Sequence, residues 1–203
     1  NLTKNLKIGF DYKNTSYFFY HLALNNNLIP ANLQNPCLIP KATKNETELE
    51  GSRKAHLRDG VSITKFLYWL KNHHSLEEEN EISVANKLFS FRKSNELFHS
   101  VSFDSISAIG KNAALPHYRA DKNNPVSLNN NSIYLSDSGG QYYDGTTDIT
   151  RTIILGKPNK EQIDRFTRVL KGHIKLSAHI FNKGTKGTDI DYLARESLQE
   201  LNC

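Results

Sequence analysis

The stretch DSGGQYYDGTTDITRT, residues 137–152, constrains the fold of this chain more than any other segment. It lies between two runs, residues 132–137 and 149–155, that are rich in the β-branched and aromatic residues favoured in strands. Between them, Ser138-Gly139-Gly140 and Asp144-Gly145 are turn-forming sequences. The pattern therefore predicts two antiparallel strands joined by a loop over residues 138–147.

The middle of the chain changes from helical to strand periodicity. A long helix is predicted over residues 47–72, with a second helix over residues 81–95. The first carries its apolar stripe at Ile63, Phe66, Leu67 and Leu70. Residues 99–110 alternate apolar side chains with serines, which predicts one half-buried strand.

The two ends of the chain also carry strand and helix patterns. Residues 6–12 and 15–26 predict a strand and an aromatic helix, followed by a loop rich in Pro and Asn over residues 28–48 that marks a boundary. A long helix follows residue 160, and a last one runs from about residue 188 to 203. The apolar stripe of the long helix comprises Ile163, Phe166, Leu170 and Ile174. Helices and antiparallel strands in separate blocks indicate the α+β class.

Composition excludes several classes of protein. The net charge is +5, but the lysines are scattered among asparagines, so we expect no nucleic-acid partner. No apolar run reaches the roughly 20 residues of a membrane span, so we expect no membrane partner. Two distant cysteines and the lack of a signal-peptide pattern indicate a cytoplasmic protein. The chain has no methionine, even at position 1, which indicates a piece of a longer protein.

Asp137 and Asp148 are the first candidate site residues, because they lie at the strand ends and not at the tip of the loop. If they face each other across an antiparallel pair, their side chains are roughly 4.5–5.5 Å apart. Two such carboxylates repel unless a cation lies between them, and oxygen ligands suit hard ions such as Mn²⁺ or Mg²⁺. The alternative is structural, since Asp is common at turns and strand ends. The neighbouring threonines fit either reading, as strand residues or as hydroxyls that orient the aspartates.

His117 is the second candidate, in the segment GKNAALPHY at residues 110–118. It follows Pro116 in a turn that precedes the strand bearing Asp137. An imidazole at such a place can hold a substrate carbonyl or carry a proton. A lone histidine is more often a plain loop or core residue, so this alternative stays open.

Together these motifs resemble a known family. GKNAALPHY, followed by YLSDSGGQYYDGTTDITRTIILGKP, closely resembles the Xaa-Pro aminopeptidases, metallopeptidases with the pita-bread catalytic fold. The family pattern reads approximately G-x-N-A-A-x-x-H-Y, then D-S-G-x-Q-Y-x-D-G-T-T-D-x-T-R-T. Gly140 departs from it, because the family usually has Ala there. The resemblance extends over nearly all of the chain.

The resemblance implies a fold and a site. Residues 1–38 would be the tail of a preceding α/β domain of the creatinase type, and residues 39–203 the first half of the pita-bread domain. Asp137 and Asp148 would be two ligands of a dinuclear Mn²⁺ site, and His117 would line the substrate pocket and assist proton transfer. The implied reaction is hydrolysis of the bond between an N-terminal residue and a following proline, with peptides that carry proline second as partners.

The resemblance also implies that part of the site is missing. The family completes its metal site with a histidine and two glutamates, and no matching stretch follows LARESLQELNC. We therefore expect a piece that is inactive alone, and a homodimer or a complementing second half to cover an apolar face built from Ile133, Leu135 and Ile153. Two alternatives remain, namely a non-catalytic pita-bread scaffold or binding protein and a hydrolase of the prolidase or creatinase type.

Overall fold

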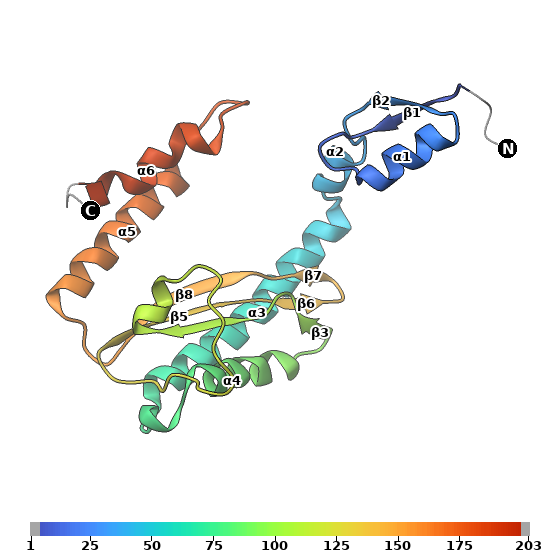
Figure 1. Ribbon diagram of the computed structural model, residues 1–203. Coiled ribbons are helices and arrows are strands. Elements are labelled where there is room, and N and C mark those ends of the chain that lie inside the picture. The colour runs from blue at the N-terminus through green and yellow to red at the C-terminus, as the bar shows by residue number, and fades with distance from the viewer. Residues whose placement is uncertain (1–4, 200–203) are drawn as a thin grey trace. The chain divides into compact units, whose positions relative to one another are not determined.

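The computed structural model describes residues 5–199, which fall into two compact units, Asn1–Arg53 and Lys54–Cys203 (Figure 1). The division lies within the first turns of a long helix, α3 (Glu46–Asn72). The domain boundary expected after residue 38 stays a prediction, because the border between two compact units is not necessarily the border between two domains.

The first unit is a small β-α-β arrangement. Strands β1 (Lys7–Phe10) and β2 (Ile29–Asn32) pair in parallel, and helix α1 (Tyr17–Asn25) connects them. The strand and helix predicted here are present. The loop predicted over residues 28–48 is wrong, because it contains β2 and a short helix, α2 (Leu38–Ala42). Pro30 is typical of a loop, because it has no N–H to donate to a sheet. Among the described residues, however, β2 pairs with β1 alone, and a strand that pairs on one side only can accommodate a proline.

Two helices form one layer of the second unit. The long helix predicted over residues 47–72 is α3, and the second is α4 (Glu81–Lys93), with a short 3₁₀ turn, η1 (Leu76–Glu78), between them. Asn80 caps α4, accepting from the backbone N–H groups of Ile82 and Ser83, while the Ser83 hydroxyl accepts from the Asn80 N–H. These bonds fix where α4 begins.

The helices pack on one face of a three-stranded antiparallel sheet with the order β4-β5-β8. Its strands are β4 (Ile106–Ile109), β5 (Ser132–Ser138) and β8 (Ile149–Leu155). The core joins Phe66 and Leu70 of α3 to Tyr134 of β5, among others. This burial of apolar surface is the main force that holds the two layers together.

Strand register corrects the expected apolar face. Tyr134 lies opposite Ile153 and Leu135 lies opposite Thr152, so Ile153 is on the helix-covered face and packs against the core. Ile133 and Leu135 are on the other face, together with Asp137, because side chains alternate along a strand. The face that bears Asp137 is therefore half-buried, whereas Tyr134 and Ser136 are buried under the helices.

A second small sheet has the order β3-β6-β7, with strands β3 (Phe98–Val101), β6 (Gly140–Tyr142) and β7 (Gly145–Thr146). The single strand predicted over residues 99–110 is wrong. It breaks between Val101 and Ile106, and its two parts pair with β6 and β5 respectively. The alternating pattern continues through the break, so periodicity alone does not reveal the change of partner.

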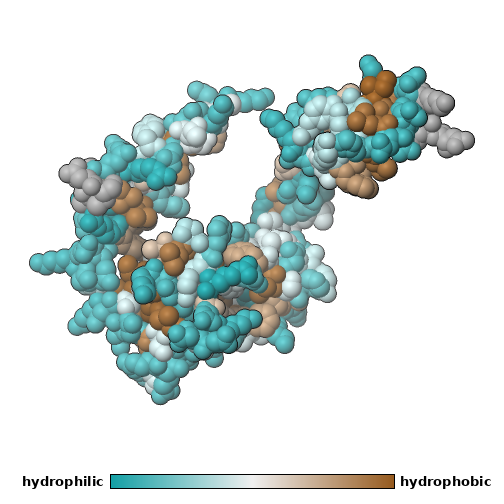
Figure 2. Space-filling view, in the orientation of Figure 1, coloured by the Kyte–Doolittle hydropathy of each residue, from teal (hydrophilic) through white to brown (hydrophobic). Residues whose placement is uncertain are grey.

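Helices α5 (Lys160–Ala178) and α6 (Gly187–Gln199) form a hairpin at the end of the described chain. They approach closely at Gly172, where a methyl group would collide with the carbonyl oxygen of Ala194. Both helices agree with the predictions, although residues 200–203 lie outside the described range. The apolar stripe of α5 is exposed, and Figure 2 shows brown surface along this hairpin. The exposed side chains of α5 include Ile163, Phe166, Val169, Leu170 and Ile174.

Candidate functional site

Asp137 lies in the β5–β8 ladder and Asp148 directly precedes strand β8, but the two are not opposite each other. The register pairs Asp137 with Thr150, whose hydroxyl donates to an Asp137 carboxylate oxygen at 2.8 Å. Asp148 lies two residues before Thr150 and one before the first residue of β8, so it is outside the ladder itself. The expectation of a directly opposed pair is therefore wrong. The hydroxyl role considered for the threonines is seen at Thr150.

The two carboxyls differ in their surroundings. Asp137 is half-buried, whereas Asp148 is exposed and precedes the first residue of β8. Both are acceptor-only groups when ionised, which is the donor set that hard divalent cations take. Within residues 5–199, however, no three or more His, Cys, Asp or Glu side chains gather in a way that would hold a metal. The described chain thus contributes a pair of carboxylates that fits part of a metal site.

His117 lies in a turn after the 3₁₀ segment η2 (Gly110–Ala114), which follows β4 directly. This segment contacts both β4 and β5, so the turn belongs to the same part of the unit as Asp137. The His117 side chain is exposed, and its backbone has a φ of 56°, in the left-handed region. Few non-glycine residues adopt that region, and histidine is among those enriched there.

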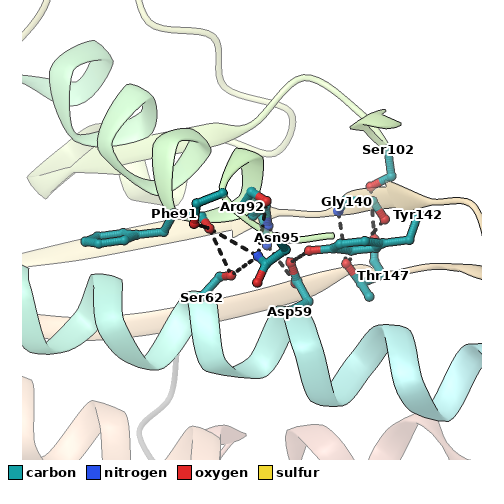
Figure 3. A network of polar contacts seen from close by, with 10 residues as sticks. Asp59, Ser62, Phe91, Arg92, Asn95, Ser102, Gly140, Tyr142 and Thr147 are labelled. Atoms are coloured by element: carbon teal, nitrogen blue, oxygen red, sulfur yellow. Dashed lines mark hydrogen bonds and ion pairs between the residues drawn. The ribbon is translucent and has the colours of Figure 1, made fainter. Parts of the chain in front are cut away.

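A buried polar cluster supports the hairpin that leads to Asp148 (Figure 3). Asp59 of α3 accepts two hydrogen bonds from Arg92 of α4, at 2.7 and 3.0 Å, and both side chains are almost fully buried. The Tyr142 hydroxyl of β6 donates to the same carboxylate at 2.8 Å. One buried ion pair therefore ties both helices to the β6–β7 hairpin.

Burial and hydrogen bonding act in opposite directions on Asp59. Burial raises the pKa of its carboxyl, but the hydrogen bonds and charge of Arg92, with further bonds from Tyr142 and Thr147, outweigh it and hold the pKa below its usual range. Burial, followed by the bond to Asp59, raises the pKa of Tyr142 well above its usual value. Asp59 thus stays ionised and Tyr142 protonated across the neutral range.

Thr147, the residue before Asp148, is fixed by several bonds. Its N–H donates to the Gly140 carbonyl at 2.9 Å, and its hydroxyl accepts from the Gly140 N–H at 2.9 Å. Ser102 donates to its carbonyl at 2.9 Å. Gly139 passes so close to that carbonyl that any side chain at this position would collide with it. These contacts define where the chain enters β8, and hence where Asp148 lies.

Arg58 of α3 fixes the tip of the same hairpin. Its guanidinium donates to both oxygens of Asp144, at 3.0 and 2.9 Å, and its carbon lies 5.2 Å from the ring centroid of Tyr142. The hydrogen bond from Arg58 is the main reason that the pKa of Asp144 lies below its usual range. The sequence predicts only a turn role for Asp144, and the structure adds this ion pair.

The buried charges Asp59 and Arg92 are not among the residues predicted to form the site, although the sequence contains a signal for them. Asp59 is four residues before Ile63 and therefore lies on the apolar stripe of α3. Arg92 is four residues after Leu88 on α4 and is likewise in phase with buried apolar positions. A charge in phase with an apolar stripe predicts a buried partner, because an unpaired buried charge is strongly unfavourable.

Ser138 and Arg151 complete the stretch. Ser138 is fully buried on the helix-covered face of β5, and its hydroxyl is the one buried side-chain polar atom without a partner among the described residues. Arg151 is exposed and donates to the carbonyl of Thr150 at 2.8 Å. Neither residue is brought to the carboxylates by a described hydrogen bond.

None of the helices within residues 5–199 has the length and apolar character to cross a membrane. The described cysteine, Cys37, is exposed and has a free thiol.

The chain is similar in sequence to known aminopeptidases. Among curated proteins, it is 44% identical over 168 residues to a probable Xaa-Pro aminopeptidase P of Paracoccidioides brasiliensis, covering 82% of this chain and 27% of the relative. A probable Xaa-Pro aminopeptidase P of Laccaria bicolor is also 44% identical, with 82% and 26% covered. The chain thus spans about a quarter of the length of these relatives.

Solved structures agree with this comparison. The X-prolyl aminopeptidase of Caenorhabditis elegans, described as a cytosolic enzyme with a di-nuclear active site, superposes with a TM-score of 0.76 at 39% identity. That alignment covers 87% of this chain and 29% of the other. The prolidase of Pyrococcus furiosus gives a TM-score of 0.77 at 24% identity, covering 98% and 56%, which shows a shared fold.

The expected fold class is therefore confirmed, an α+β arrangement that matches part of the pita-bread aminopeptidase and prolidase structures. The model of metallopeptidase family M24 matches residues 50–203, which is most of the chain and contains the whole candidate site. The chain belongs to metallopeptidase family M24.

Proposed function

We propose that this chain is part of a metal-dependent aminopeptidase that releases an N-terminal residue from peptides whose second residue is proline. The 39% identity to the C. elegans X-prolyl aminopeptidase, over 87% of this chain, carries the proposal. The positions of Asp137 near the end of β5 and of Asp148 directly before its partner strand β8 support it.

In this proposal Asp137 and Asp148 are metal ligands. The group that they hold is a pair of divalent ions, Mn²⁺ in our assignment, which would polarise the scissile carbonyl and supply a nucleophilic oxygen. Thr150 orients Asp137 through its 2.8 Å hydrogen bond, so that the carboxylate keeps one rotamer. The ligands that complete the site are expected from the part of the relatives that this chain does not span.

His117 is assigned to the substrate side of the site. Its imidazole is exposed, which leaves both ring nitrogens accessible to a bound peptide. A neutral imidazole offers one donor and one acceptor, so it suits either holding a carbonyl oxygen or transferring a proton to the departing proline nitrogen.

The first test uses a full-length protein that carries this sequence. Replacing Asp148→Asn should abolish Mn²⁺-dependent cleavage of an Xaa-Pro peptide and lower the metal content measured by elemental analysis, since a carboxamide is a poorer ligand for a hard cation. Asp144→Asn, which changes the same functional group at the hairpin tip, should leave the metal content intact. Near wild-type turnover by Asp148→Asn would contradict the assignment.

The second test separates the roles of His117 and the carboxylates. His117→Ala should keep the metal content of the wild type while lowering turnover, because a proton-transfer or polarising group typically contributes on the order of 10²–10⁴-fold. Loss of metal from His117→Ala would instead make His117 a ligand.

The chain of 203 residues alone is expected to show no peptidase activity. Two carboxylates without further His or Glu ligands hold a divalent ion weakly, and within residues 5–199 no larger metal-holding set is present. Purified chain, supplied with Mn²⁺ and an Xaa-Pro peptide, checks this expectation. Chelator-sensitive turnover by the isolated chain would mean that other residues form the site.

Two alternatives are separated by the same assays. A non-catalytic scaffold or binding relative would show no turnover as a full-length protein, even with metal bound. A hydrolase of the prolidase type would cleave an Xaa-Pro dipeptide and leave longer peptides intact. We assign the protein to the cytoplasm, following the cytosolic C. elegans enzyme, with a homodimer or a complementing second half as the expected partner.

A further inference from the structure

Glu81 is a second buried carboxyl in the helix layer, and the site described above does not use it. It is the first residue of α4 and has no exposed surface. The backbone on both sides is held, since the Glu81 N–H donates to the Val126 carbonyl at 3.1 Å and Asn80 caps the helix. Its position at the helix N-terminus also suits a carboxyl group.

The Glu81 carboxyl accepts three hydrogen bonds from one short segment. The Ile109 N–H donates at 2.8 Å, the Asn112 side-chain amide at 3.1 Å and the Tyr118 hydroxyl at 2.7 Å. Asn112 also donates to the Tyr118 hydroxyl at 2.9 Å. The three donors lie directly before the 3₁₀ segment η2, within it, and four residues after its end, next to His117.

This arrangement leaves the loop of residues 110–118 attached at its beginning, middle and end to a single side chain. His117 is one residue from the Tyr118 attachment and adopts a left-handed backbone with a φ of 56°. A non-glycine residue keeps such a conformation only where its surroundings enforce it. The His117 side chain is exposed, so its own packing does not supply that constraint.

The chemistry of the donors suits a holding role. A backbone amide, a side-chain amide and a phenol are all neutral, so the carboxyl is satisfied by hydrogen bonds that have fixed directions. Burial and the contact with Glu81 raise the pKa of Tyr118 to about 12, so its hydroxyl remains a donor at every pH where a peptidase assay is run.

We propose that Glu81 is a positioning residue, which holds the loop of residues 110–118 so that the His117 imidazole is presented to the substrate. The proposal rests on the function assigned to His117 above. It also explains the polar residues of the GKNAALPHY segment, since Asn112 and Tyr118 are the groups that bind the Glu81 carboxyl.

The test is a double-mutant cycle in the full-length protein with Mn²⁺. Glu81→Ala should lower kcat by about 10²-fold, the size expected when a catalytic group is displaced by roughly 1 Å. In a His117→Ala background the same change should have almost no further effect, since no imidazole remains to be positioned. A purely structural role would lower kcat equally in both backgrounds, and that result would overturn the proposal.

Matched variants separate the hydrogen bonds from folding. Glu81→Gln keeps one acceptor oxygen and should restore kcat to within about tenfold of wild type, while Tyr118→Phe, which removes one of the three bonds, should give a small loss in the same direction. Glu78→Ala, an exposed carboxylate in the preceding turn, should have no effect. If Glu81→Ala does not fold, the cycle is run with Tyr118→Phe, and equal losses in both backgrounds again overturn the proposal.

A second readout does not depend on activity. Hydrogen exchange of residues 109–118, followed by mass spectrometry, should accelerate at least tenfold in Glu81→Ala and remain unchanged in Glu78→Ala. If the wild type cleaves no Xaa-Pro peptide, the proposed function fails, yet this measurement still decides whether Glu81 holds the loop. Unchanged exchange in Glu81→Ala would refute the positioning role even in an active enzyme.

Discussion

Two buried carboxyls reach from the same helix layer, and each holds a segment that carries a candidate site residue. The Asp59 cluster (Asp59, Arg92, Tyr142 and Thr147) fixes the hairpin before Asp148. The Glu81 cluster (Glu81, Ile109, Asn112 and Tyr118) fixes the turn around His117. The clusters differ in their partners, because only the Asp59 cluster contains a cation.

This difference bears on how each cluster responds to change. Removing one partner of a buried ion pair leaves a charge without compensation, which is far more costly than losing a neutral hydrogen bond. The Asp59 cluster should therefore dominate stability. The Glu81 cluster should act mainly on local geometry, because its neutral donors tolerate a neutral acceptor.

The largest expected effect is at Asp59. Asp59→Asn should lower the free energy of unfolding by about 3–5 kcal/mol, because the buried Arg92 loses its counter-charge. Urea unfolding of the 203-residue chain measures this loss, with Asp104→Asn as an exposed control. A loss below about 1 kcal/mol would mean that the ion pair contributes no more than a surface pair.

The same variant makes an acid-pH prediction. The pKa of Asp59 is lowered in the folded protein, so its stabilising contribution is present above the ordinary value near 3.8 and is lost as pH falls through the lower, folded value. The stability difference between wild type and Asp59→Asn should thus shrink below pH 3.8. A constant difference across that window would contradict the assignment.

The matched change at the second cluster should be milder. Glu81→Gln should lower the free energy of unfolding by about 1–3 kcal/mol, because one of the three neutral donors loses its best acceptor. No charged partner is left without a counter-charge. Urea unfolding of Glu81→Gln measures this loss, with the exposed Glu78→Gln as the control. Equal losses for Asp59→Asn and Glu81→Gln would remove the distinction between the clusters.

The ion pair at the hairpin tip should contribute less than either cluster. The side chains of Arg58 and Asp144 are 20% and 24% exposed. A double-mutant cycle of Arg58→Gln and Asp144→Asn should give a coupling free energy of about 1 kcal/mol, reduced by added salt. A coupling of several kcal/mol would place this pair with the buried one.

The smallest difference is expected in strong base. The pKa of Tyr118 is raised from 10.0 to about 12, so its contribution is complete below pH 10 and is lost as pH rises towards 12. Over that window wild type should lose stability more steeply than Tyr118→Phe. Parallel curves for the two proteins would show that the Tyr118 hydroxyl is not held as described.

Sequence patterns predicted the α-helices other than α2, and the β5–β8 pair, because each is encoded by local periodicity. The apolar stripe through Ile63 and Phe66 predicts α3, and alternation through residues 149–155 predicts β8. Asp137 was placed at the correct end of β5. Its partner was not, since register depends on the path of the chain between the strands.

The chain between β5 and β8 does not form a simple hairpin, because part of it pairs with a remote segment. At Gly139 the chain leaves β5 and crosses closely under the Thr147 carbonyl, so that β6 pairs with β3 instead of extending the first ladder. Two glycines in a row favour a turn in any reading. The structure instead has strand β6 beginning directly after Gly139 and pairing with β3, and such contacts between remote segments are invisible to a single sequence.

The sequence separation within the two clusters has a consequence for folding kinetics. The bond of Tyr142 to Asp59 joins residues 83 positions apart, and the neighbouring bond of Arg58 to Asp144 spans 86. The bonds of Glu81 span 28 to 37 positions, and the Asp59–Arg92 bonds span a similar 33. Closing a longer loop costs more entropy, so contacts between remote segments form more slowly. We therefore expect the turn around His117 to become protected before the hairpin that carries Asp148 during refolding. Substitutions of Tyr142 should then act chiefly on the unfolding rate, and those in the Glu81 cluster more on the folding rate.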